Sequence, residues 1–220
     1  MAHVLHYRRG DALAAWEGPG YEVGCITGDQ ARQFDALEAV MLGVLEAGEL
    51  SLSADGFELL LMPGDCFVVP AGLVLNWLPT GALRCVFIRF PGLEGVPSHE
   101  HPVKLDLHGP LQPCPPPAAE VLLGPAPRAW SQSGFEQGAL RIGVWACEPY
   151  ERRQVEPKYS ELMHIIAGQL TLTEKSGGAH TVAAGETLVV PAGATNAWAS
   201  DVPVRNASWA EAVSRPDPHC

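Results

Sequence analysis

Two stretches of the chain are copies of one another, GDCFVVPAGLVLNW at residues 64–77 and GETLVVPAGATNAW at residues 185–198. Seven of the fourteen positions are identical, and the second copy begins 121 residues after the first. Solenoid repeats have periods of about 20–50 residues, so this period indicates two whole domains. Each domain has roughly 90–100 residues, which is enough for its own core.

The copies and the composition between them set the expected domain boundaries. We expect an N-terminal domain at residues 1–91 and a C-terminal domain at residues 129–214, followed by a tail at residues 215–220. Residues 92–128 form a linker that is rich in proline, which removes hydrogen-bond donors and favours extended backbone. Within the linker, apolar and polar residues alternate at 103–107, which favours an edge strand. Residues 117–124 favour a short helical turn.

Composition and charge restrict the classes of partner. The chain has 220 residues and a formal net charge of −11, with only 14 Lys and Arg, which argues against nucleic acid or anionic membranes as partners. It has no apolar run of the ~20 residues that a membrane span needs, and its N-terminus lacks a signal-peptide core. Six cysteines lack any C-x-x-C pair, so we expect a soluble, cytoplasmic protein without a disulfide framework.

Short alternating segments separated by turn residues predict an all-β fold. Residues 49–53 and 57–61 alternate, and Asp55 and Gly56 between them predict a hairpin turn. Residues 46–48 are predicted to be an earlier turn, matched in the second copy at residues 167–168. Many short strands with few helix signals favour antiparallel sandwiches or barrels.

The copied stretch resembles the second sequence motif of the cupins, G-x5-P-x-G. It spans Gly64 to Gly72 and again Gly185 to Gly193. Residues 144–209 are similar to the ethanolamine-utilisation and (S)-ureidoglycine aminohydrolase-type cupins, including an E-x6-G segment that begins at Glu161. The resemblance implies two tandem cupin barrels with the RmlC-like jelly-roll fold, and a homodimer formed through sheet edges. Cupins host many chemistries, so the fold alone does not identify a function.

The resemblance also implies a metal site of three histidines and one carboxylate in each barrel. In the second copy the carboxylate position is Glu161, the last histidine position is Asn196, and the other two fall within residues 154–157, which read QVEP. In the first copy the matching positions are Met41, Leu75 and residues 34–37. Since none of these positions is a histidine, we expect no metal and no other cofactor.

Other histidines lie outside these positions. His99 and His101 form an H-x-H pair with His108 nearby, all in the linker. They are interpreted as polar linker residues, with a surface metal site as the alternative. Strand alternation places His164 on the opposite face from Glu161, which favours a packed histidine over a catalytic one.

The two barrel interiors are expected to differ. Met41 and Leu75 predict a filled, structural first barrel, whereas Glu161 and Asn196 predict a polar second barrel. The candidate ligand-binding residues are Glu161, Asn196, Tyr159, Trp145 and Trp198, with Lys158, Arg153 and Arg205 as cationic partners of the carboxylate. Alternatively, Glu161 satisfies its own hydrogen-bond network and the aromatic residues are core.

Three functions remain open from the sequence. One is a metal-independent module that binds a small polar metabolite in the C-terminal barrel. Another is a metal-independent isomerase or hydrolase in which Glu161 is the candidate acid or base. The third is a degenerate relative of ureidoglycine aminohydrolase in nitrogen or amine metabolism.

Overall fold

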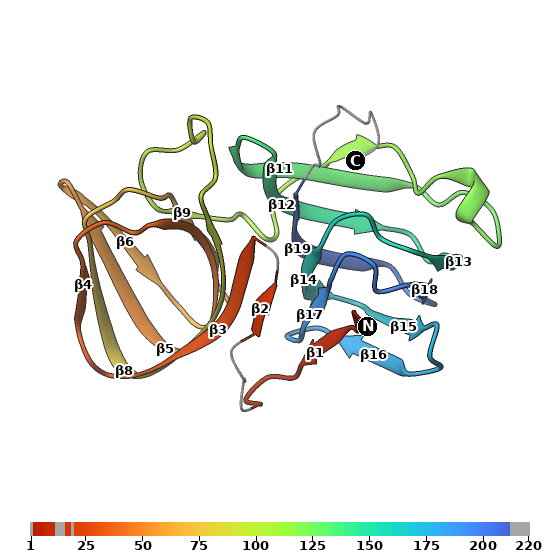
Figure 1. The fold of residues 1–220 in the computed structure, drawn as a ribbon, viewed down its shortest axis with the longest axis horizontal. Coiled ribbons are helices and arrows are strands. Elements are labelled where there is room, and N and C mark those ends of the chain that lie inside the picture. The colour runs from red at the N-terminus through yellow and green to blue at the C-terminus, as the bar shows by residue number, and fades with distance from the viewer. Residues whose placement is uncertain (1, 12–15, 19, 212–220) are drawn as a thin grey trace. The chain divides into compact units, whose positions relative to one another are not determined.

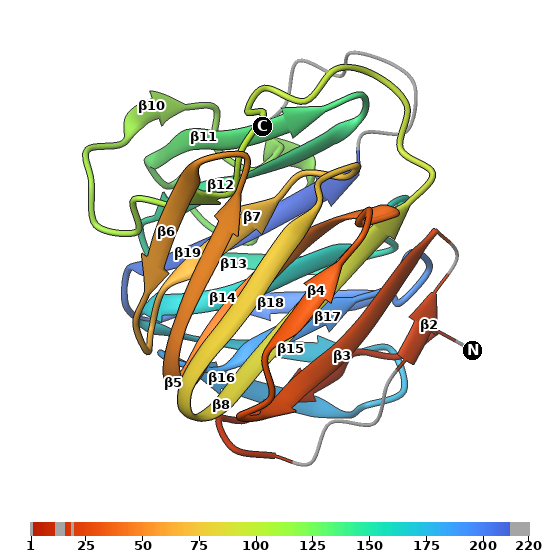
Figure 2. The same cartoon turned by 90° about the vertical axis from the view of Figure 1, so that its left-hand side faces the viewer.

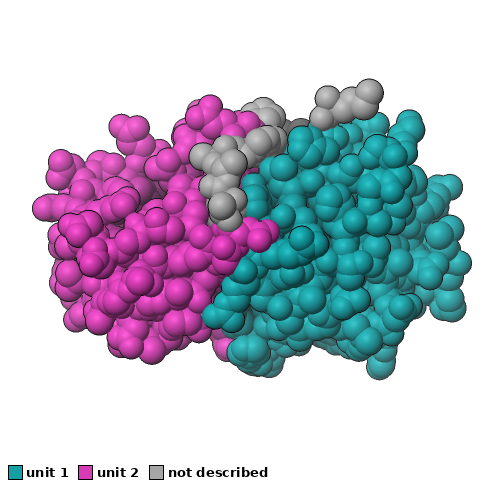
Figure 3. All heavy atoms as spheres, turned by 90° about the horizontal axis from the view of Figure 1, so that it is seen from below, with its two compact units in different colours: residues 1–9, 107–134, 139–220 teal, residues 10–106, 135–138 magenta. Residues whose placement is uncertain are grey.

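The computed structural model describes residues 2–11, 16–18 and 20–211. It divides into two compact units, coloured separately in Figure 3. Unit 1 comprises Met1–Arg9, Leu107–Gly134 and Ala139–Cys220, and unit 2 comprises Gly10–Asp106 and Phe135–Gly138. The predicted tail at residues 215–220 lies outside the described residues.

Unit 1 consists of two antiparallel sheets (Figure 1). The larger sheet has the strand order β1-β17-β14-β19-β12-β11-β10, and the smaller has the order β13-β18-β15-β16. The larger sheet contains β1 (Leu5–Tyr7), β10 (Gln112–Cys114), β11 (Ala129–Gln137), β12 (Leu140–Cys147), β14 (Glu161–Ala167), β17 (Thr187–Val190) and β19 (Val204–Glu211). The smaller contains β13 (Glu151–Val155), β15 (Gln169–Glu174), β16 (Ala179–Ala183) and β18 (Asn196–Ala199).

Alternate residues of both sheets meet in one buried cluster. Met163 and Ile165 of β14 contribute from the larger sheet, and Leu170 and Leu172 of β15 contribute from the smaller sheet. This is the interdigitation expected where two sheet faces pack about 10 Å apart. The second copied stretch contributes Val190 at its strand end and Trp198 after its turn.

Unit 2 is built on two long strands that bend around a core. Its sheet has the order β2-β3-β8-β5-β7-β9, with β4 on β8 and β6 on β5, and Figure 2 shows β4, β8, β5 and β6 side by side. The strands are β2 (Trp16–Gly18), β3 (Tyr21–Gly28), β4 (Arg32–Phe34), β5 (Ala39–Ala54), β6 (Phe57–Leu61), β7 (Cys66–Val69), β8 (Leu75–Pro91) and β9 (Val103–Lys104). Strands β5 and β8 pair along most of their length, which holds the curved sheet together.

The interior of unit 2 is apolar. Met41 and Leu75, at the positions of a cupin carboxylate and histidine, lie at 3% and 0% exposure in a cluster with Phe67 and Trp77. The sequence prediction of a filled first barrel agrees with this packing. The fold class is all-β, as predicted.

Several local predictions are confirmed and one is wrong. The hairpin turn between β5 and β6 has Asp55 and Gly56 at positive φ, 46° and 80°. The linker forms edge strand β9 and a single 3-10 turn, η1 (Ala119–Val121). The predicted turn at residues 46–48 is instead an irregularity within β5, since Ala47 and Glu49 both pair with β8. At the matching place in unit 1 the strand does break, between Ala167 and Gln169.

The first residues of the chain belong to unit 1. Strand β1 pairs with β17, with Leu5 opposite Val189, and His6 Nε2 lies 3.0 Å from Glu186 Oε2. The edge of the larger sheet is therefore covered by a segment that the sequence placed with the N-terminal domain. Among the described residues no helix has the length and apolar character that a bilayer crossing requires.

Candidate functional site

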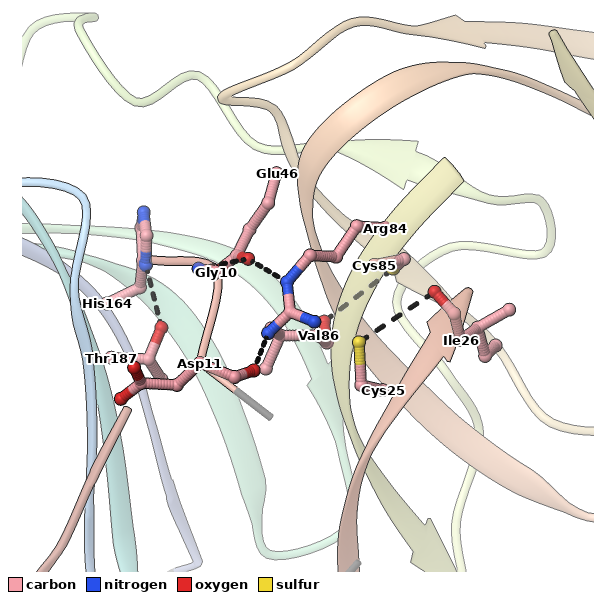
Figure 4. A network of polar contacts seen from close by, with 10 residues as sticks. All are labelled: Gly10, Asp11, Cys25, Ile26, Glu46, Arg84, Cys85, Val86, His164 and Thr187. Atoms are coloured by element: carbon pink, nitrogen blue, oxygen red, sulfur yellow. Dashed lines mark hydrogen bonds and ion pairs between the residues drawn. The ribbon is translucent and has the colours of Figure 1, made fainter. Parts of the chain in front are cut away.

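Glu161 is the first residue of β14 and lies on the inner face of unit 1. It alternates with Met163 and Ile165, which are in the buried cluster, and pairs with Val190 of the copied stretch. His164 points to the opposite face, where its Nδ1 lies 2.9 Å from Thr187 Oγ1 (Figure 4). The prediction of a packed His164 is confirmed, and burial lowers its pKa to about 4 with help from the charge of Arg9.

Asn196 occupies the histidine position of the second copy and is held by an arginine. Arg152 of β13 donates from Nη1 to the Asn196 main-chain oxygen at 2.7 Å and from Nη2 to Asn196 Oδ1 at 2.8 Å. Asn196 is 1% exposed, and its Nδ2 donates to the Ala194 oxygen at 2.8 Å. Both ends of the side-chain amide are thus engaged, and the guanidinium is fixed in orientation.

The same arginine acts on Glu161. Part of the Glu161 residue is exposed, yet desolvation of its carboxyl raises the pKa to about 7, and the positive charge of Arg152 limits the rise. Among the described residues no side chain or main-chain group hydrogen-bonds to the carboxylate. The alternative in which Glu161 satisfies its own network therefore finds no partner in these residues.

Aromatic rings pack beside these polar groups. The Tyr150 ring stacks on Trp198 with centroids 5.4 Å apart, and the Trp145 ring meets Trp198 edge-on at 6.3 Å. Burial raises the pKa of Tyr150, and the charge of Arg152 opposes this while that of Glu161 adds to it. Tyr150, Arg152 and Glu161 are therefore electrostatically coupled within one site.

The structure brings together some of the predicted ligand-binding residues and separates others. Glu161, Asn196, Trp145 and Trp198 all face the interior of unit 1, whereas Lys158, Tyr159 and Arg153 are exposed. Arg205 follows the buried Val204 on β19, so strand alternation directs it to the outer face of the sheet.

Arg152 and Tyr150 were missed by sequence reasoning. A register shift between Arg152 and Val155 interrupts the pairing of β13 with β18, so simple alternation cannot tell which of two adjacent arginines turns inward. The Arg152–Arg153 pair was the available signal, and Arg153 was chosen as the candidate.

The linker histidines have packing contacts. The His101 ring stacks on the Phe57 ring with 5.0 Å between centroids. His99 Nδ1 and Ser98 Oγ are hydrogen-bonded at 3.0 Å. His108 is exposed. In the described part of the chain, no cluster of three or more His, Cys, Asp or Glu residues could hold a metal ion.

Comparison with known proteins identifies the fold family. Residues 135–207 match the EutQ-like cupin domain. This part of the chain is therefore a cupin domain, and it lies within unit 1 for most of its length. The chain is similar to a DUF861-family protein of unknown function from Pseudomonas syringae pv. tomato, with a TM-score of 0.88, 25% identity, and coverage of 96% of this chain and 100% of that one.

Other solved structures are more distant and show the shared fold alone. A cupin 2 conserved barrel domain protein from Leptotrichia buccalis aligns with a TM-score of 0.65 at 12% identity, over 96% of this chain and 89% of that one. A salicylate 1,2-dioxygenase variant from Pseudoaminobacter salicylatoxidans aligns with a TM-score of 0.57 at 11% identity, over 87% and 71%. The comparison with curated proteins gives no match.

The residues at the cupin metal position do not fit a transition metal. Mn, Fe, Ni and Zn bind imidazole and carboxylate ligands, and this position offers one carboxylate, Glu161, and one amide, Asn196. The oxygen of that amide already accepts from Arg152, whose positive charge opposes a cation at the same place.

Proposed function

We propose that this protein binds a small polar metabolite in unit 1 without a metal. The ligand contacts Glu161, Arg152 and an aromatic wall formed by Tyr150, Trp145 and Trp198. The ligand class carries an N–H donor for the Glu161 carboxyl and an oxygen acceptor for Arg152, as amines, amides and ureides with a carbonyl or carboxylate do. The observation that carries the proposal is a Glu161 carboxyl turned inward, unbonded to any described residue, beside an oriented guanidinium.

The hydrogen-bonding capacity of Arg152 supports this role. A guanidinium has five N–H donors. Arg152 donates two hydrogen bonds to Asn196 and one to the Arg153 main-chain oxygen at 3.4 Å, and its side chain also hydrogen-bonds to Tyr150. One of the five donors is left for a ligand, while Asn196 holds the side chain in its orientation.

The aromatic residues support recognition of a small planar or amine-bearing group. Trp198 is 5% exposed and is packed by Tyr150 and Trp145, so its position is set before a ligand arrives. A preorganised wall lowers the entropic cost of binding because few side chains must be ordered.

Acid–base catalysis is the second candidate. A carboxyl group whose pKa lies near 7 can donate or accept a proton at neutral pH, which is the condition for general acid–base work. An isomerase or hydrolase acting on an amine or amide, including a degenerate relative of ureidoglycine aminohydrolase, would use Glu161 in this way.

A thermal-shift screen of polar metabolites tests the binding proposal. Compounds that raise the melting temperature of the unmodified protein should fail to do so with Glu161→Gln and Arg152→Gln. Met41→Gln, at the matching position of unit 2, is the control and should keep the response. Metabolites that stabilise all four proteins equally would contradict the proposal.

Turnover separates the two candidates. A compound found in the screen is incubated with the protein and followed by NMR. Unchanged compound supports a binding module, whereas conversion that is lost in Glu161→Gln supports an enzyme.

A further inference from the structure

Two arginines occupy matching places in the two units. Arg84 of β8 pairs with Ala47, just after the register shift in β5, and Arg205 of β19 pairs with Ala167, just after the equivalent shift in β14. The two positions are 121 residues apart, the same offset as the copied stretches. Their surroundings can therefore be compared residue by residue.

In unit 2 the arginine has a carboxylate partner from its own chain. Arg84 Nε donates to Glu46 Oε2 at 2.6 Å, and the Glu46 side chain is only 5% exposed (Figure 4). Arg84 Nη2 donates to the main-chain oxygen of Asp11. The buried charge of the guanidinium is thus both paired and hydrogen-bonded, as a buried charge must be.

In unit 1 that carboxylate is missing. The residue before Ala167 is Ile166, where unit 2 has Glu46 before Ala47. Arg205 Nη2 donates to the Gly109 oxygen at 2.7 Å, but Arg205 Nε is buried and has no hydrogen-bond partner. A buried donor without a partner destabilises the folded state, and the effect is larger when the group is charged.

A hollow lies beside Arg205. It has a volume of about 330 Å³ and is lined mainly by apolar groups, including Trp130, Ala146, Pro203 and Val204 beside Arg205. The other charged group at its edge is Glu148. Its carboxylate is taken by Arg128, through Arg128 Nε at 2.8 Å and the Arg128 main-chain nitrogen at 2.9 Å, so it does not neutralise Arg205.

We propose that this hollow binds a small monocarboxylate whose carboxylate pairs with the guanidinium of Arg205 and whose apolar part contacts Trp130 and Ala146. The ligand then supplies the carboxylate that Glu46 supplies to Arg84 in unit 2. An apolar lining with one cationic donor selects for one carboxylate on an apolar body over a multiply charged anion. Arg205 and its cross-strand partner Ala146 point to the outer face of the sheet that carries Glu161 on its inner face, so this site is independent of the proposed metabolite site.

Calorimetric titration with butyrate and benzoate tests the proposal, with butyramide, benzamide and inorganic phosphate as comparisons. We expect the carboxylates to bind in the millimolar range or tighter, and the neutral amides and phosphate at least about tenfold more weakly. Equal binding of amides or phosphate, or no carboxylate binding in this range, would overturn the proposal.

Two variants locate the binding. Arg205→Gln should weaken carboxylate binding at least about tenfold, and exposed Arg128→Gln serves as the control with a smaller effect. Ile166→Glu restores the carboxylate of unit 2 beside Arg205, so it should raise the melting temperature and abolish carboxylate binding. If Ile166→Glu binds benzoate as the unmodified protein does, the assignment to Arg205 is wrong, even where Arg205→Gln fails to fold.

Discussion

Arg152 donates two hydrogen bonds to Asn196, one to its main-chain oxygen at 2.7 Å and one to its side-chain Oδ1 at 2.8 Å. Asn196 stands where the last histidine of a cupin metal site is expected. At this position the side chain binds the Arg152 guanidinium instead of a metal ion. Burial raises the pKa of both Glu161 and Tyr150, and the positive charge of the guanidinium limits both rises. One residue from β13 therefore acts on both ionisable groups of this interior.

Removing that guanidinium should destabilise the protein and raise the pKa of Glu161 further. Arg152→Gln loses charge-assisted hydrogen bonds and leaves the buried Asn196 Oδ1 without its partner, so we expect a loss of about 2–3 kcal/mol in chemical denaturation. Exposed Arg153→Gln is the neighbouring control and should change stability by less than about 0.5 kcal/mol. Equal effects of the two variants would show that the Asn196 contact is not important for stability.

Glu161 should make the protein less stable as pH rises. Its folded pKa, about 7, lies above the unfolded value near 4.3, so its stabilising contribution is complete below about pH 4.3 and is lost as pH rises through 7. Glu161→Gln removes this dependence. Its melting temperature should exceed that of the unmodified protein at pH 8, by the equivalent of about 1–3 kcal/mol, and the difference should shrink at pH 5. A pH-independent difference would contradict the raised pKa.

His164 should make the protein less stable as pH falls below neutral. Its folded pKa, about 4, lies below the unfolded value near 6.5, so the protein loses stability as pH falls from 6.5 to 4. In His164→Gln the amide can still hydrogen-bond to Thr187. Its free energy of unfolding in urea should therefore fall by about 2 kcal/mol less between pH 7 and pH 5 than that of the unmodified protein. An unchanged slope would mean that His164 is protonated in the folded state.

Two glycines at positive φ should differ in their tolerance of alanine. Gly193, in the copied turn, has φ 82° and open space at its Cβ position, so Gly193→Ala should cost about 1–2 kcal/mol from backbone strain alone. At Gly168, φ 84°, a Cβ would lie 2.1 Å from the Pro203 oxygen. Gly168→Ala should therefore be clearly more destabilising in the same denaturation assay, and similar losses for both would contradict the close approach.

The copied stretches predicted the fold class and the contrast between the two interiors, because strand ends and turns are encoded locally. Glu161 and Asn196 were found by their positions relative to Gly168 and Gly193. Arg152 could not be found in this way, since the register shift in β13 changes which face each side chain takes. The sequence shows that Ile166 stands where unit 2 has Glu46, but only the structure shows that Arg205 Nε is buried without a partner among the described residues.

The central claim is that the second barrel holds an ionisable carboxyl beside a guanidinium in place of a metal site. A carbon-13 NMR titration of the Glu161 carboxyl, assigned with Glu161→Gln and repeated with added Mn²⁺, tests it most directly. We predict a midpoint near pH 7 and no selective broadening by Mn²⁺. A midpoint near 4.3, the value of an unperturbed glutamate, or selective broadening of the Glu161 resonance would contradict the claim.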